Sequence, residues 1–167
     1  MTAIIHDLNE QDFSSLKINN IENVEIISET ITSMPCIGCY DCWFKTPGTC
    51  KINDGLKNIG ALLGNCEDMI IISQNNYGGY SESVKKIMDR CISGALPFFT
   101  YRSGVMRHMD RYKIKRKCFT VFLYGDFLEI EKKTAELFIE AHRSNMSFKD
   151  GKLHIIGHFS EIGNLLK

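Results

Sequence analysis

The sequence contains few prolines, carries no net charge and has no long apolar run, and each shortage narrows what the chain can be. Only three of its 167 residues are proline while 44% are hydrophobic, which fits one domain with a sizeable core. The formal net charge is zero, so no overall field attracts nucleic acid or an anionic membrane, and neither partner is expected. Because the N-terminus lacks an export leader and no apolar run approaches spanning length, we expect a soluble cytoplasmic protein.

Seven cysteines are an odd number, which favours thiols, ligands or redox groups over a disulfide framework. Cys36, Cys39, Cys42 and Cys50 form a C-x2-C-x2-C-x7-C run in CIGCYDCWFKTPGTC. Thiols at every third position wrap a loop around one point, a spacing that suits a [4Fe-4S] cluster. Zinc ranks lower because it more often takes two separated hairpins, and four reduced cysteines are the alternative without metal. The remaining cysteines, predicted to be small core residues, are Cys66, Cys91 and Cys118.

The stretch DMIIISQNNYGGYSESVKKIMDR, residues 68–90, is typical of a strand, a loop and a helix. Its apolar run at 69–72 shows no polar alternation, as expected of a strand buried on both faces of a parallel sheet. Residues 73–81 are polar and contain Gly78-Gly79, a composition that lets the backbone approach a planar or phosphorylated ligand. Ligands of open α/β sheets lie beyond the carboxyl ends of strands, so this loop is the candidate site. A plain crossover loop is the alternative.

Alternating strands and helices predict a doubly wound α/β domain spanning residues 1–167, with a parallel sheet covered on both faces. The expected strands are 3–8, 24–28, 69–72, 118–124 and 153–157. Helices are expected after Asn53 or Asp54, after Ser81 and from about Glu129. Their predicted inner faces are Leu56, Ile59 and Leu63; Val84, Ile87, Met88, Cys91 and Ile92; and Ile130, Thr134, Leu137, Phe138 and Ala141.

Residues 94–117 depart from a minimal repeat of strands and helices and form an aromatic and basic insertion. Exposing Phe98, Phe99 and Tyr101 would be costly, so they are expected to form a subunit interface or to roof the site. Dimerisation is therefore expected. The basic run at 102–117 is more often a solvated face than a binding surface.

The sequence resembles the flavodoxin-like NAD(P)H-dependent FMN reductase family, particularly the branch that includes iron-sulfur flavoproteins. The resemblance rests on CIGCYDCWFKTPGTC with the following Asn53-Asp54, on IIISQNNYGGYSESVKKIMDR, and on LPFFTYRSG with RHMDRY. It implies a five-stranded parallel sheet of order 2-1-3-4-5 with FMN across its carboxyl edge. It also implies electron transfer from NAD(P)H through FMN to a quinone, flavin or iron-sulfur acceptor, and a cluster on the four cysteines.

The same resemblance implies the cofactor-binding residues, while no catalytic residue follows from it. One loop would contact the ring and a second would add contacts, with Tyr77 or Tyr80 stacked on the ring face. The implied residues are Ser73, Asn75, Asn76, Tyr77, Gly78, Gly79, Tyr124, Gly125 and Asp126.

One departure concerns the FMN phosphate. Family members bind it with a Gly/Ser-rich loop after the first strand, where this chain has NEQDFSSLK. Glu10 and Asp12 oppose a phosphate cradle, which leaves the basic run at 102–117, from a second subunit, as a candidate to hold the phosphate. The alternative function is a non-catalytic flavodoxin-like subunit, or a thiol or metal redox sensor, that has lost tight FMN binding.

Overall fold

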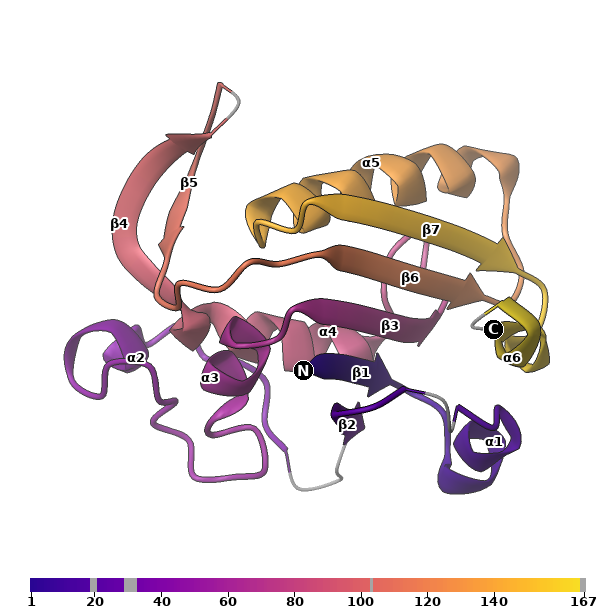
Figure 1. Cartoon of the computed structure of the whole chain (residues 1–167), viewed down its shortest axis with the longest axis horizontal. Coiled ribbons are helices and arrows are strands. Elements are labelled where there is room, and N and C mark those ends of the chain that lie inside the picture. Colours follow the sequence, from indigo (N-terminus) through magenta and orange to yellow (C-terminus); the bar gives the residue numbers. More distant parts are fainter. Residues whose placement is uncertain (19–20, 29–32, 103, 166–167) are drawn as a thin grey trace.

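A five-stranded parallel sheet forms the centre of the computed structural model, which describes residues 1–18, 21–28, 33–102 and 104–165 (Figure 1). The strands lie in the order β2-β1-β3-β6-β7. All five expected strands are present, β2 and β6 with the predicted bounds and the others with bounds that differ by a few residues. They are β1 (Thr2–His6), β2 (Val24–Ser28), β3 (Asp68–Gln74), β6 (Cys118–Tyr124) and β7 (Asp150–Ile156).

Helices cover both faces of the sheet, as predicted (Figure 1). On one face, α3 (Ile59–Gly64), α4 (Glu82–Arg90) and α5 (Glu129–Asn145) enclose the larger hydrophobic core. On the other, α1 (Glu10–Ser15) and α6 (Ile162–Leu165) enclose a smaller one. Within the described ranges, every helix is too short or too polar to cross a bilayer.

Helix α4 begins as predicted, whereas α3 does not. Ser81 is the N-cap of α4, and its hydroxyl accepts a hydrogen bond from the Val84 N–H at 3.4 Å. The sequence predicts Asn53 or Asp54 as a helix cap, but the Asp54 carboxylate accepts from the backbone N–H groups of Leu56 and Met34 and pairs with Arg90. The chain turns through 55–58 and α3 starts only at Ile59.

The predicted inner face of α5 is wrong. Ala135 and Ile139 are the residues of this helix that are buried, whereas Ile130 is 76% exposed and Leu137 65% exposed. The predicted face is Ile130, Thr134, Leu137, Phe138 and Ala141. Phe138 packs edge-on against the buried Tyr80, with ring centroids 5.0 Å apart, and Thr134 lies beside Gly78. Ile130 and Leu137 face outward and leave an apolar stripe on the outer surface of α5.

The insertion at 94–117 contains an antiparallel hairpin of β4 (Ala95–Arg102) and β5 (Val105–Asp110). The hairpin projects from the end of the sheet where the parallel strands begin (Figure 1). Phe98, Phe99 and Tyr101 are exposed on it. Two arginines of this segment hydrogen-bond to backbone carbonyl groups. Arg111 donates to the carbonyls of Ser93 and Ala95. Arg116 donates to those of Leu63, Gly64 and Met146.

The remaining short elements are α2 (Asp41–Phe44), the 3-10 turn η1 (Cys91–Gly94) and the 3-10 turn η2 (Phe159–Glu161). Helix α2 lies within the cysteine run, on the same side of the molecule as the hairpin (Figure 1). The cysteine run and the basic segment thus lie at the amino edge of the sheet. The predicted flavin loops follow the ends of β3 and β6 and lie at the opposite, carboxyl edge.

Candidate functional site

A pocket of about 330 Å³ opens at the carboxyl edge, where the β3–α4 loop meets the β6–α5 loop. We call these two loops, residues 75–80 and 125–128, the rim. Four residues predicted to bind cofactor line the pocket: Asn75, Asn76, Tyr77 and Asp126. Sequence reasoning missed three further lining residues, namely Phe127, Leu128 and Glu131.

Several polar groups of the rim bind one another. The Asn75 amide donates to the Asp126 carbonyl at 2.8 Å and to a Glu131 carboxylate oxygen at 3.0 Å, and its oxygen accepts from the Gly78 N–H at 2.9 Å. Asn75 therefore ties the two loops together. Ser73 is fully buried and accepts from the Ser81 N–H at 2.8 Å, so it supports the loop from beneath.

The rim loop has a strained, closely packed backbone. Tyr77 and Gly78 both adopt the left-handed conformation, with φ of 53° and 81°. A Cβ on Gly78 would lie 2.6 Å from the Glu131 carbonyl oxygen, whereas one on Gly79 would make an ordinary contact at 3.4 Å. This arrangement turns the Tyr77 side chain outward, where it is 82% exposed. Gly125, in the second rim loop, is also left-handed with φ of 105°.

Tyr80 does not face the pocket. It is buried, and its hydroxyl lies 3.0 Å from Nδ1 of His142 on α5. Of the two tyrosines predicted to stack on a ring, only Tyr77 is at the surface. Burial lowers the pKa of His142 to about 4.

The buried His142 is expected to make the fold less stable in mild acid. The unfolded chain takes up the proton near pH 6.5 and the folded chain only near pH 4, so stability is full above 6.5 and falls as pH drops toward 4. We expect about 2 kcal/mol of stability to be lost between pH 7 and pH 5 through this residue. Burial also lowers the pKa values of His6 and His154, which act in the same direction. Denaturant unfolding of His142→Gln at the two pH values should therefore show a smaller change in the free energy of unfolding than the unaltered chain does. An equal change in the two proteins would contradict the part given to His142.

The chain leaves β1 through Asp7, whose carboxylate bridges the ends of two other strands. One oxygen accepts from the Gln74 N–H at 2.8 Å and the other from the Tyr124 hydroxyl at 2.9 Å. Burial and then the charge of Asp7 raise the pKa of Tyr124. These bonds explain why β1 ends at His6 rather than at Leu8 as predicted. They also direct the hydroxyl of Tyr124, a predicted cofactor contact, toward Asp7.

Helix α1 begins at Glu10, shortly after Asp7, and its first turn brings more negative charge to this edge. Asn9 caps the helix by accepting from the Asp12 N–H at 2.8 Å, and its amide donates to the Asp12 carboxylate. Phe13 stacks on His6 with ring centroids 4.0 Å apart, which holds α1 over the end of β1. The rim thus offers aromatic and amide groups suited to a flavin ring, while the part of the edge beside β1 does not suit a phosphate.

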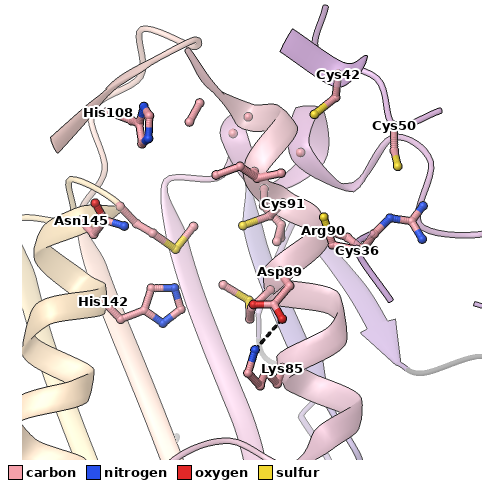
Figure 2. Close-up of a pocket in the computed structure, with 18 of the residues that line it drawn as sticks. Cys36, Cys42, Cys50, Lys85, Asp89, Arg90, Cys91, His108, His142 and Asn145 are labelled. Carbon is pink, nitrogen blue, oxygen red and sulfur yellow. Dashed lines mark hydrogen bonds and ion pairs between the residues drawn. The ribbon is translucent and has the colours of Figure 1, made fainter. Parts of the chain in front are cut away.

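A larger cavity of about 1050 Å³ lies between α4, α5, the hairpin and the cysteine run (Figure 2). Cys36, Cys42 and Cys50 stand on one side of it and His142 and Asn145 on the other. Cys39 and Cys91 also line it, as do Asn76, Gly79 and Tyr80 from the rim loop. No sequence signal indicated this cavity, because its walls come from segments far apart in the chain.

Arg90 holds the cysteine run against α4. Its side chain is fully buried and donates two hydrogen bonds to Asp54, at 2.8 and 2.9 Å, and one to the Met34 carbonyl at 2.7 Å. Burial and then the neighbouring cysteines raise the pKa of Cys42. In the described ranges, no group of three or more His, Cys, Asp or Glu side chains is placed to hold a metal ion. The predicted cluster therefore gains no support from this geometry.

Comparison with known proteins supports the fold. No protein-family model matches the sequence, and neither does any curated protein. Among solved structures, the fold is similar to that of an FMN-dependent NADH-azoreductase from Bacillus anthracis str. Ames Ancestor in complex with FMN. The TM-score is 0.57 at 13% sequence identity, over 99% of this chain and 92% of that one.

Proposed function

We propose that this chain is a flavin-dependent oxidoreductase that takes electrons from NAD(P)H. The observation that carries the proposal is the pocket at the rim, at the carboxyl edge of a parallel sheet whose fold is similar to that of an FMN-binding enzyme. Open α/β sheets bind their ligands at this edge. The ring would be held by Asn76, Tyr77, Asp126 and Phe127.

A bound flavin supplies the redox chemistry, accepting a hydride and passing electrons to a quinone, another flavin or an iron-sulfur carrier. The protein supplies position and shielding. Tyr77 offers an exposed aromatic face and Phe127 an apolar wall, while Asn75 fixes the distance between the loops that carry them. The bonds of Asn75 and the packing of Gly78 keep the rim in one conformation before the ligand arrives.

Flavin titration of the purified chain, followed by assays of NADH and NADPH oxidation with the same flavins, tests the proposal. We expect binding, flavin-dependent oxidation, and an affinity about two- to tenfold weaker in Tyr77→Ala, because one ring contact contributes about 0.5–1.5 kcal/mol. Phe44→Ala is the matched control, since Phe44 is 72% exposed on α2 at the opposite edge. A chain that neither binds flavin nor oxidises NAD(P)H contradicts the proposal.

A second candidate function is a thiol redox module, which is favoured by the position of Cys36, Cys39, Cys42 and Cys50 around one cavity. Oxidation of these thiols would then alter the chain without turnover. Counting free thiols before and after mild oxidation, in the unaltered chain and in a Cys-to-Ser variant of each position, tests this function. Steady NAD(P)H oxidation would eliminate it as the main role.

An absorption spectrum of protein prepared without oxygen separates a flavin from an iron-sulfur cluster, because the two absorb in different visible bands.

A homodimer is part of the proposal. The exposed aromatics of the hairpin and the outer stripe of α5 support it, since apolar patches of this kind mark interfaces. We expect Phe99→Ser to shift the chain toward monomer in sedimentation experiments, and Glu25→Ser, an exposed polar change on the edge strand β2, to leave the oligomeric state unchanged. A monomeric unaltered chain contradicts this part.

A further inference from the structure

We infer that the rim takes a flavin without a phosphate, such as riboflavin, in preference to FMN. The inference rests on the proposed function and concerns the part of the ligand that extends from the ring toward β1. Three features of that part of the edge carry it: the position of Asp7, the donors that Asp7 uses, and the charge that surrounds it.

Asp7 lies at the crevice where a ligand of this fold type is expected. In the order β2-β1-β3-β6-β7 the chain winds outward in both directions from the boundary between β1 and β3. Ligands of doubly wound sheets bind outside the carboxyl ends of the strands at this point. Asp7 follows β1 directly and binds the N–H of Gln74, the last residue of β3, so its carboxylate spans this boundary.

The Asp7 carboxylate also uses the donors that an incoming anion would need. A phosphate is held by backbone N–H groups and hydroxyls that point toward it. Here the Gln74 N–H and the Tyr124 hydroxyl both donate to Asp7. The protein thus supplies its own anion at the place of a phosphate, and an external one finds these donors occupied.

The surroundings add negative charge. Glu10 and Asp12 lie in the first turn of α1, and the last turn of that helix carries no basic residue. None of the described hydrogen bonds to Asp7, Asn9 or Asp12 comes from a lysine or an arginine. A phosphate dianion would therefore be repelled at short range and would not be neutralised.

The hydroxyl groups of riboflavin suit the same place. A carboxylate only accepts hydrogen bonds and a phosphate dianion also only accepts, so the two cannot bond each other. An alcohol donates, and the side chain of riboflavin ends in neutral hydroxyls that can bind a carboxylate at Asp7 or Asp12. Ring recognition at Tyr77 and Phe127 is the same for both flavins, so the phosphate decides the preference.

Titration of the full chain with riboflavin and with FMN tests the inference. We expect riboflavin to bind at least about tenfold more tightly. Added salt should strengthen FMN binding by screening the repulsion and leave riboflavin binding unchanged. Asp7→Asn, which keeps one acceptor oxygen, should raise the FMN affinity about tenfold and change riboflavin by less than about threefold. Asp150→Asn makes the same charge change at the start of β7, at the opposite edge, and should alter neither affinity.

Each outcome decides a different point. FMN that binds as tightly as riboflavin, or that weakens with salt, overturns the inference and leaves the proposed function standing. Failure of both flavins to bind overturns the proposed function itself. If Asp7→Asn does not fold, the inference is tested by Asp12→Asn and by the salt dependence of FMN binding to the unaltered chain. Both measure the repulsion between the phosphate and the carboxylates beside β1.

Discussion

Replacing Asp54 with alanine is expected to lower the free energy of unfolding by about 3–5 kcal/mol, because it leaves a buried guanidinium without its partner. Arg90 is only 1% exposed, and its two hydrogen bonds to Asp54 connect residues 36 positions apart. The same carboxylate also accepts from Met34 and Leu56, so the change releases the cysteine run from α4. Denaturant unfolding measures the loss, and the thiols of the run should become more reactive.

Asp89→Ala is the matched control, since Asp89 precedes Arg90 on α4 and pairs with Lys85 at an exposed position. It should change stability by no more than about 0.5 kcal/mol. Bonding to Arg90 lowers the pKa of Asp54 to about 2, so the pair is stabilising above about pH 4 and this contribution is lost as pH falls through 2. Equal effects of the two alanine substitutions would show that the buried pair contributes no more than a surface one.

Gly78→Ala is expected to destabilise the chain by about 2–4 kcal/mol and to abolish flavin binding. Gly78 is left-handed with φ of 81°, and an added Cβ would meet the Glu131 carbonyl at 2.6 Å and the Thr134 Cβ at 2.9 Å. Both contacts are with α5, so the rim loop must move outward and separate from the loop that carries Asp126. The pocket between the two loops would then be lost.

Gly79→Ala provides the control within the same loop. Its added Cβ would lie 3.4 Å from the Asn76 carbonyl oxygen, so we expect a loss below about 1 kcal/mol and retained flavin binding. Unfolding curves and flavin titrations of both variants make the comparison. If the two variants behave alike, the packing of Gly78 on α5 does not determine the conformation of the rim.

Local patterns predicted the elements of the fold but not the contacts between them. The strands and the helix capped by Ser81 follow from apolar runs, spacing and a cap, all of which lie within a few residues. Helix α5 carries apolar residues on two sides, and its sequence does not say which side meets the sheet. The packing of Gly78 and the bond between Tyr80 and His142 decide this, and both involve distant segments.

In the candidate site, too, local patterns were readable from the sequence and contacts between distant segments were not. The polar loop with its glycine pair indicated where the rim lies, because its composition is unusual for a plain connection. Glu10 and Asp12 predict an edge unsuited to phosphate, which stays a prediction; the sequence did not indicate Asp7, because its hydrogen bonds depend on the ends of β3 and β6. The cysteine spacing predicted a cluster site, and all four cysteines line the large cavity, but in the described ranges no three of them are placed to hold a metal ion, because spacing alone does not set the distances that a cluster needs.

Asn76 lines both the pocket at the rim and the large cavity. The loop at 75–80 therefore forms a wall that the two spaces share. Any displacement of that wall enlarges one compartment at the expense of the other. A molecule in the pocket at the rim and a second one in the large cavity would therefore weaken each other's binding through this shared wall, without direct contact.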